Sequence, residues 1–441
     1  MPRFYPRLRP ATPQADPGLT HTIPLSDLTD LENIKNNVTG NYYLTCDIDA
    51  ILTADPGYEA GKGWKALCAG APYFTGTIDG CGHKISNLFI NRPTEIAGFF
   101  MGVQAEAVIA NLSFDNVDML CGSGGVLASY LMCGGSVAPK IYNCHVSGIL
   151  KAGGTYVREI GGMFGSASLG WGGSGAKAQI YDSTSAVTID AVTYHTDPDP
   201  NNVGGFFGHV NGMCIARNCL STGNVTACGV TGTGGQAVGG FVGWACGSYG
   251  PTDEFYDCAA EGDVIGDSLV GGFVGFGAIS DFYRCSAVGN VTAVATAGTA
   301  GGFDASLGNT AVEENCYAWG NVVGGGVTGK AGGFVTQSTG TNTHCYSIGT
   351  VAAASKGGFS VSGGTYDHCF WDKESSGQPT SGGGTGLTTI QAQTESTYTS
   401  VGWDFVTVWY MPKGARQKIM GRPKTGYPVH GPHTAMRNVF G

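Results

Sequence analysis

The stretch Gly239-Gly240-Phe241-Val242-Gly243 returns as Gly271-Gly272-Phe273-Val274-Gly275, and this unit decides the fold. Successive copies lie 25 to 43 residues apart. A unit this short cannot bury its apolar residues alone, whereas stacked copies form a continuous core. The related copies are Ala97-Gly98-Phe99-Phe100, Gly124-Gly125-Val126-Leu127, Gly161-Gly162-Met163-Phe164, Gly204-Gly205-Phe206-Phe207, Gly301-Gly302-Phe303, Gly332-Gly333-Phe334 and Gly357-Gly358-Phe359.

A second unit lies about a dozen residues after each copy of the first and combines a polar residue with a cysteine, as in Tyr256-Asp257-Cys258. A glycine turn and a valine follow it, as in Gly262-Asp263-Val264. The sequence therefore predicts about three short strands in each period, joined by glycine turns. This pattern is typical of a parallel β-helix, a solenoid whose rungs stack ~4.8 Å apart, with glycine at the sharp corners.

The composition agrees with an all-β protein. The chain has 75 glycines and 42% hydrophobic residues but only 13% charged residues, so the usual surface residues of helices are scarce. The glycines have no three-residue period, which excludes collagen. Short apolar runs between glycines favour strands and tight turns.

Charge is unevenly spread along the chain. The formal net charge is −10, yet both ends are basic, so residues 26–409 carry −18. An acidic body argues against general nucleic-acid binding, which needs a basic surface. The ends are predicted to be extended, proline-containing arms, residues 1–25 and 410–441, that anchor partner proteins; the basic residues proposed for this role are Arg3, Arg7, Arg9, Lys413, Arg416, Lys418, Arg422 and Lys424. The alternative is that they are solvated ends.

Targeting signals are not apparent. No apolar run follows the arginines near Met1, so no signal peptide is expected, and no stretch approaches the length of a membrane span. We therefore expect synthesis in the cytoplasm.

Seven cysteines share one position of the repeat, and Ser183 takes the same position in another copy. Such a column should point inward. Its role is metal binding, disulfide bracing or packing; packing is favoured, because no zinc-type spacing is present and stacked parallel side chains hold Cβ atoms too far apart for a disulfide. Neither a metal site nor a cofactor is expected. The column is Cys144, Cys219, Cys258, Cys285, Cys316, Cys345 and Cys369.

Residues 26–95 are predicted to form an N-terminal cap and the first rungs, because a solenoid must close its ends with atypical sequence. A short helix is expected near Asp30-Leu31-Glu32-Asn33-Ile34, followed by a strand from Asn41. The repeats are then expected to run from residue 96 to residue 409.

The elements Tyr42 to Asp49, Phe74 to Leu88, the Gly-Gly-Phe series, Phe370 to Gly377 and Gly402-Trp403-Asp404-Phe405 resemble bacterial and phage proteins with GLUG-type repeats. The resemblance covers residues 28 to 409. It implies a right-handed parallel β-helix, found in surface adhesins, in non-catalytic regions of larger secreted proteins and in virion proteins. It supplies no catalytic motif.

Many β-helices degrade polysaccharides, so an enzyme is the leading rival interpretation. Such enzymes need clustered carboxylates. The candidates are expected in turns, where they cap corners, and no catalytic residue is predicted. They are Asp182, Asp253, Glu254, Asp257, Glu261, Asp281, Glu313, Glu314 and Asp367.

Aromatic residues near loops and corners are better candidates for binding. They could stack on a glycan or fill an oligomer interface or the core, and the interface or core is favoured. The tryptophans singled out are Trp171, Trp244, Trp319 and Trp371.

Together these features predict a non-enzymatic structural or binding subunit of a large assembly. A phage virion component ranks first: a capsid decoration protein, tail fibre or tail spike that forms a homotrimer, contacts capsid or tail proteins and binds a host surface glycan. A cell-surface adhesin ranks second. A glycoside hydrolase or polysaccharide lyase ranks third.

Overall fold

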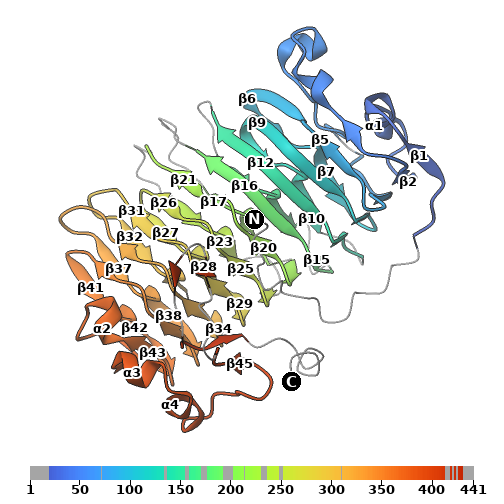
Figure 1. Cartoon of the computed structure of the whole chain (residues 1–441). Coiled ribbons are helices and arrows are strands. Elements are labelled where there is room, and N and C mark those ends of the chain that lie inside the picture. The colour runs from blue at the N-terminus through green and yellow to red at the C-terminus, as the bar shows by residue number, and fades with distance from the viewer. Residues whose placement is uncertain are drawn as a thin grey trace.

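The computed structural model shows an all-β chain in which short strands stack in parallel along one axis (Figure 1). The colour passes from blue to red along the stack, so neighbouring periods of the sequence are neighbouring layers of the structure. This confirms the predicted all-β, solenoid-like architecture. The described residues are 19–70, 72–133, 137–153, 158–169, 176–191, 202–212, 214–229, 236–247, 252–308, 310–412, 418–419, 422–423 and 426–430.

Two parallel sheets contain the repeat strands. The first, sheet A, contains β1 (Ile23–Leu25), β2 (Asn41–Leu44), β4 (Thr77–Asp79), β7 (Phe100–Gln104), β8 (Val108–Ala110), β10 (Ala128–Cys133), β11 (Lys140–Tyr142), β14 (Phe164–Leu169), β15 (Ala178–Tyr181), β18 (Phe207–Val210), β19 (Cys214–Arg217), β23 (Val242–Cys246), β24 (Asp253–Tyr256), β28 (Val274–Ala278), β29 (Ser280–Tyr283), β33 (Asp304–Leu307), β34 (Val312–Glu314), β38 (Val335–Thr343) and β42 (Ser360–Asp367).

The second, sheet B, contains β3 (Ile48–Asp49), β5 (Lys84–Ser86), β6 (Phe89–Ala97), β9 (Ser113–Gly125), β12 (His145–Ala152), β13 (Glu159–Gly161), β16 (Thr184–Asp190), β17 (Asn202–Gly204), β20 (Leu220–Ser221), β21 (Val225–Ala227), β22 (Ala237–Gly239), β25 (Ala259–Ala260), β26 (Val264–Gly266), β27 (Leu269–Gly271), β30 (Ser286–Ala287), β31 (Val291–Ala293), β32 (Thr299–Gly301), β35 (Tyr317–Ala318), β36 (Val322–Val323), β37 (Lys330–Gly332), β39 (Tyr346–Ser347), β40 (Val351–Ala352), β41 (Ser355–Gly357), β43 (Phe370–Asp372) and β44 (Thr385–Leu387).

A well-ordered period contains five short strands, from β27 to β31, rather than the three that the sequence predicts. Each pairs in parallel with its counterpart in the next period, from β32 to β36. The extra breaks come from single residues with left-handed backbone: Ile279 (φ 54°) separates β28 from β29, and Arg284 (φ 55°) separates β29 from β30. Neither residue is a glycine, so composition alone does not reveal these corners.

Phenylalanine rings stack from rung to rung in the core. Their centroids lie 4.8 to 5.1 Å apart, close to the rung spacing of a parallel sheet. Phe255 and Phe282 form a second stack at 5.1 Å whose rings meet the first edge-on. The first stack consists of Phe206, Phe241, Phe273, Phe303, Phe334 and Phe359, all fully buried.

The paired glycines of the repeat are required by close approach between rungs. A Cβ atom added to Gly272 would lie 2.0 Å from the carbonyl oxygen of Gly302 in the next rung. Any side chain there would push the two backbones apart and break the ladder of hydrogen bonds, so only glycine fits.

Non-repetitive sequence closes both ends of the stack. At the N-terminal end α1 (Leu28–Asn33) is capped by Asp27, whose carboxylate accepts a hydrogen bond from the Asp30 amide at 2.9 Å. At the C-terminal end the repeat strands end with β44, before residue 409, and helices α3 (Thr389–Ala392) and α4 (Glu395–Thr399) follow (Figure 1). The remaining elements are η1 (Ile34–Asn36), η2 (Ile51–Ala54), η3 (Tyr58–Gly61), α2 (Lys373–Ser376) and the antiparallel pairs β45 (Trp409–Tyr410) with β48 (Val429–His430) and β46 (Lys418–Ile419) with β47 (Arg422–Pro423).

Within the described residues, no helix is both long and apolar enough to cross a membrane.

Candidate functional site

A corner column of polar residues runs along the solenoid, directly before the cysteine column. Its members all have left-handed backbone, with φ between 49° and 56°. Side chains bridge successive rungs: Asn218 donates to Asp182 at 3.1 Å, and Arg284 forms a bidentate pair with Asp257 at 2.7 and 2.8 Å. Asp182 and Asp257 therefore stabilise corners. The column is Asn111, Asn143, Asp182, Asn218, Asp257, Arg284, Asn315, His344 and His368.

The expectation that the other acidic residues lie in turns is wrong for six of them. Asp253 and Glu254 lie in β24, Asp281 in β29, Glu313 and Glu314 in β34, and Asp367 at the end of β42. The corners lie after the strands that contain these acidic residues, later in the repeat than the sequence pattern suggests. The acidic side chains therefore belong to strands, in which successive side chains point to opposite faces of the sheet.

Two acidic side chains replace apolar residues inside the core. In register, Asp304 lies between Val274 and Val335, and Glu313 takes the place next to Phe282. Both carboxyl groups are fully buried, and burial raises the pKa of each well above its ordinary value. Asp304 Oδ2 and Glu313 Oε1 have no hydrogen-bond partner among the described residues. Their burial therefore favours the protonated, neutral form of each carboxyl group.

All seven column cysteines are buried thiols without disulfides. The backbone amide of Cys285 donates to Cys316 Sγ at 3.4 Å, and that of Cys316 to Cys345 Sγ at 3.4 Å. Burial raises the pKa of Cys144 to about 12. Ser183 occupies the same slot, and its hydroxyl accepts a hydrogen bond from the Cys144 amide at 3.1 Å. Enclosed thiols without disulfides pack as small apolar groups.

The strongest candidate for a binding surface lies on the outer face of sheet A. Tyr256 and Tyr283 stack at 5.0 Å with their rings nearly parallel, and the Arg217 guanidinium lies 3.9 Å from the Tyr256 ring centroid. On the neighbouring strands of the same sheet, Trp244 and Phe276 stack at 4.2 Å. All five side chains are partly or fully exposed. We call these five residues the ladder face.

Charged groups accompany the ladder face. Lys177 Nζ lies 2.5 Å from Glu254 Oε1, and the Tyr256 hydroxyl donates to Glu254 Oε2 at 2.8 Å. Burial acts to raise the pKa of Glu254, but the hydrogen bonds from Lys177 and Tyr256 outweigh it and hold this pKa below its ordinary value. Asp281 lies beside Glu254 in the next rung, and burial followed by the Glu254 charge raises its pKa. Stacked rings with an ion pair and a second carboxyl group can bind a sugar ring or a complementary protein surface.

Of the three predicted tryptophans within the described residues, one takes part in the ladder face. Trp244 does, whereas Trp319 and Trp371 are 3% and 6% exposed and belong to the interior, so glycan stacking by these two is ruled out. Trp319 Nε1 donates to the Tyr346 hydroxyl at 2.7 Å beneath the C-terminal segment. Trp171 lies outside the described residues. The tyrosines are visible in the sequence as parts of the repeat, but only the outward direction of alternate strand positions identifies them as surface groups.

The C-terminal arm contacts its own solenoid where it is described, and anchoring to a partner protein stays a prediction. The Tyr427 hydroxyl donates to Asp372 Oδ2 at 2.6 Å, and His430 Nε2 lies 2.7 Å from the Asn315 carbonyl oxygen. Lys418 and Arg422 lie in β46 and β47. The other proposed anchoring residues, Arg3, Arg7, Arg9, Lys413, Arg416 and Lys424, lie outside the described residues.

Among the described residues, one group of three side chains could hold a metal ion: His21, Asp79 and Cys81. It lies at the N-terminal end of the stack, on residues of no predicted site.

Comparisons with known proteins find short similarities. No protein-family model matches the chain. It is 28% identical over 152 residues to halomucin of Haloquadratum walsbyi, covering 33% of this chain and 2% of that protein. It is 35% identical over 86 residues to a "Putative Gly-rich membrane protein" of Evansella cellulosilytica, covering 19% of this chain and 10% of that protein. The chain thus spans a tenth or less of the length of these curated relatives.

Two solved structures are also similar. A "putative immunoglobulin A1 protease" from Bacteroides ovatus has a TM-score of 0.40 and 16% identity, covering 92% of this chain and 91% of that chain. A structure described as IgA1 protease has a TM-score of 0.37 and 16% identity, covering 82% of this chain and 21% of that chain.

Proposed function

We propose that this chain is a non-enzymatic structural and binding subunit of a large assembly, built on a right-handed β-helix of the GLUG-repeat type. The observation that carries the proposal is the ladder face, where stacked rings and charged groups lie at fixed spacing on the outside of a rigid sheet. Such a surface is pre-organised for contact, because its side chains lose little freedom on binding.

The role that we propose first is that of a phage virion component: a homotrimeric decoration protein, fibre or spike. The column of seven buried, unbridged thiols supports it. Stacked cysteines on adjacent rungs are safest when a chain folds in the reducing cytoplasm, where virion proteins are assembled, because an oxidising compartment favours wrong pairings during folding. The partners would be further copies of the chain, capsid or tail proteins, and a host surface glycan.

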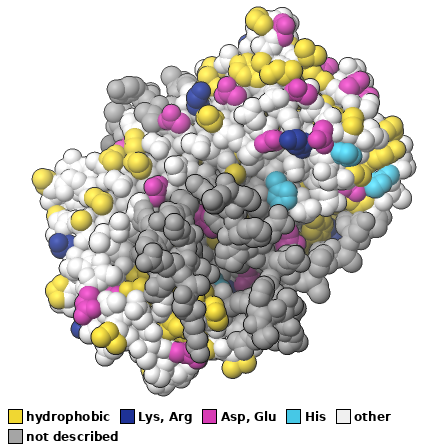
Figure 2. Space-filling view, in the orientation of Figure 1, with side chains coloured by type: hydrophobic (Ala, Val, Ile, Leu, Met, Phe, Trp, Pro, Cys, Tyr) yellow, Lys and Arg dark blue, Asp and Glu magenta, His cyan; other side chains and the backbone are white. Residues whose placement is uncertain are grey.

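The name of the Evansella relative, a membrane protein, supports a cell-surface adhesin as the second placement. On the face drawn in Figure 2, the acidic side chains that are visible are scattered rather than gathered in one patch.

One observation favours a polysaccharide-degrading enzyme as the rival function. Glu254 and Asp281 are carboxyl groups on adjacent rungs whose pKa values shift in opposite directions, as an acid and a base require. Lys177, in contact with Glu254, argues against this role, because it already neutralises that carboxylate.

The test uses the double variant Trp244→Ala with Tyr256→Ala. Both side chains point outward, so the circular dichroism spectrum should stay that of the wild type. We expect the variant to lose self-association by light scattering, or retention on host glycans, while the exposed Tyr410→Ala control keeps both. Retention of both by the double variant would contradict the proposal. Release of reducing ends from a polysaccharide, abolished by Glu254→Gln, would replace it with the enzyme.

A further inference from the structure

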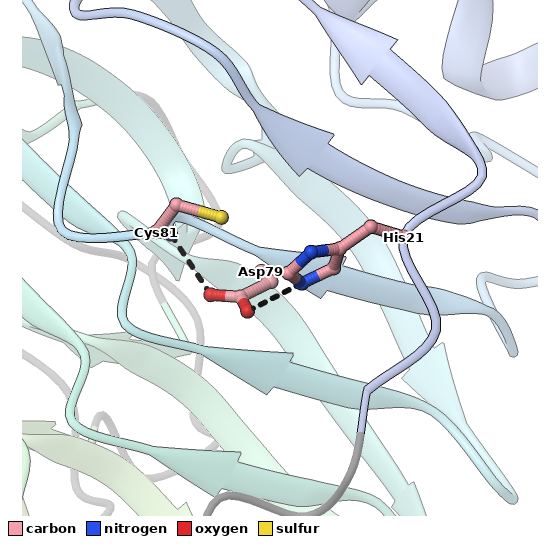
Figure 3. A group of neighbouring side chains, drawn as sticks. All are labelled: His21, Asp79 and Cys81. Carbon is pink, nitrogen blue, oxygen red and sulfur yellow. Dashed lines mark hydrogen bonds and ion pairs between the residues drawn. The ribbon is translucent and has the colours of Figure 1, made fainter.

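Three chemically different ligand groups meet at the N-terminal end of the stack (Figure 3). His21 precedes β1, Asp79 ends β4, and Cys81 lies in the turn that follows. An imidazole nitrogen, a carboxylate oxygen and the Cys81 sulfur all lie within 4.8 Å of one another. Distant parts of the sequence thus converge on one point at the edge of sheet A.

The carboxylate at the centre of this group is held rigidly. Asp79 is 5% exposed, and its Oδ1 accepts hydrogen bonds from the Cys81 amide at 2.8 Å and from Asn111 Nδ2 at 3.0 Å. Oδ2 is therefore presented to His21 Nε2, 2.8 Å away. Supporting bonds of this kind fix the direction of a metal ligand before the ion arrives.

The imidazole and the thiol are also placed by the fold. The His21 ring stacks on Tyr43 with centroids 5.0 Å apart and an interplanar angle of 22°. Cys81 has left-handed backbone (φ 52°) and is exposed, so an ion can reach it from solvent. A buried carboxylate beside an accessible imidazole and an accessible thiol distinguishes this group from an ordinary surface ion pair.

We propose that His21, Asp79 and Cys81 bind Zn²⁺, with a fourth position open to water or to a ligand from outside. Zinc takes nitrogen, sulfur and oxygen ligands at ~2.0–2.3 Å in tetrahedral geometry, which places ligand atoms ~3.5 Å apart. The three atoms reach this spacing by small side-chain movements, and two bonds to the ion replace the His21–Asp79 hydrogen bond. The thiolate selects zinc over calcium and magnesium.

A zinc ion here would tether the first strand to the stack. Among the described residues β1 pairs with β2 alone, by three residue pairs, and His21 lies two residues before it. A zinc-mediated link from His21 to the turn after β4 would span β2. It would hold the edge strand β1 by a contact additional to its backbone pairing with β2. The ion would therefore act as a clasp for the N-terminal end of the solenoid while its fourth position stays open.

The first test measures the ligands directly. Co²⁺ added to the metal-free full chain should produce the near-ultraviolet sulfur-to-cobalt absorption band, and Zn²⁺ should displace it. Cys81→Ser should abolish the band, and His21→Gln should weaken zinc binding by ~10-fold or more. Cys46→Ser is the matched control, since Cys46 is also exposed and lies in the same end of the molecule.

The second test needs no variant. In the wild-type chain, Zn²⁺ should slow alkylation of Cys81 by iodoacetamide ~10-fold or more, because a bound thiolate is blocked, while the rate at Cys46 stays unchanged. Peptide mass spectrometry resolves the two sites. Equal rates at Cys81 with and without Zn²⁺, or a cobalt band that survives Cys81→Ser, would overturn the proposal.

Discussion

Replacing Phe273 with alanine removes one ring from the middle of the continuous core stack. The side chain is fully buried, with Phe241 and Phe303 stacked on either side at 4.9 Å. Truncating a core phenylalanine costs about 3–5 kcal/mol, and each lost aromatic pair adds about 0.5–1.5 kcal/mol beyond the burial of its area. We therefore expect Phe273→Ala to lower the free energy of unfolding by about 5 kcal/mol, near the top of the range.

Phe276→Ala on the same rung is the matched control. Phe276 is half-buried on the outer face and, among the described residues, stacks on Trp244 alone, so its loss should cost about 1–2 kcal/mol. Chemical denaturation followed by near-ultraviolet circular dichroism compares the two variants, and hydrogen exchange locates the opened rungs, since a solenoid need not unfold in one step. If Phe273→Ala costs no more than Phe276→Ala, the ring stack is not what holds the rungs together.

Two further changes test the same core. Gly272→Ala places a Cβ 2.0 Å from a backbone oxygen of the next rung and should lower the melting temperature sharply, whereas Gly57→Ala, in an exposed turn, should leave it nearly unchanged; equal melting temperatures would contradict the close approach. Glu313 and Asp304 have raised pKa values, so the folded state keeps protons that the unfolded chain releases. The free energy of unfolding should therefore fall as pH rises above about 4, by about 1.4 kcal/mol per pH unit for each carboxyl group that is protonated in the folded chain and ionised in the unfolded chain. Urea titrations from about pH 5 to pH 8 should show this fall in the wild type and a smaller one in Glu313→Gln; an identical slope in both would contradict the burial of that carboxyl.

Local repetition made the core predictable from sequence. The Gly-Gly-Phe unit identifies the ring stack, because each rung repeats its neighbour's environment, and Asp182 and Asp257 lie at corners as the sequence predicts. Where one rung departs from the others, the repeat misleads: the pattern predicts a turn at Glu313, yet this residue occupies the position next to Phe282 in the core.

Contacts between distant segments could not be predicted in the same way. Trp319 becomes interior because Trp409 and Tyr427, about a hundred residues later, belong to the cluster that covers it. His21 meets Asp79 across 58 residues, so no zinc-like spacing appears in the sequence. The alternation that places Tyr256 and Tyr283 outward becomes visible only once the strands around them have been assigned.

The most direct test of the central claim is to sediment large particles from the producing culture and quantify their proteins by mass spectrometry. The account predicts that this chain sediments with a major capsid or tail protein at a fixed ratio, which stays constant through repeated purification. Its absence from such particles, together with recovery from cell envelopes or as a single soluble chain, would contradict the assignment to a virion.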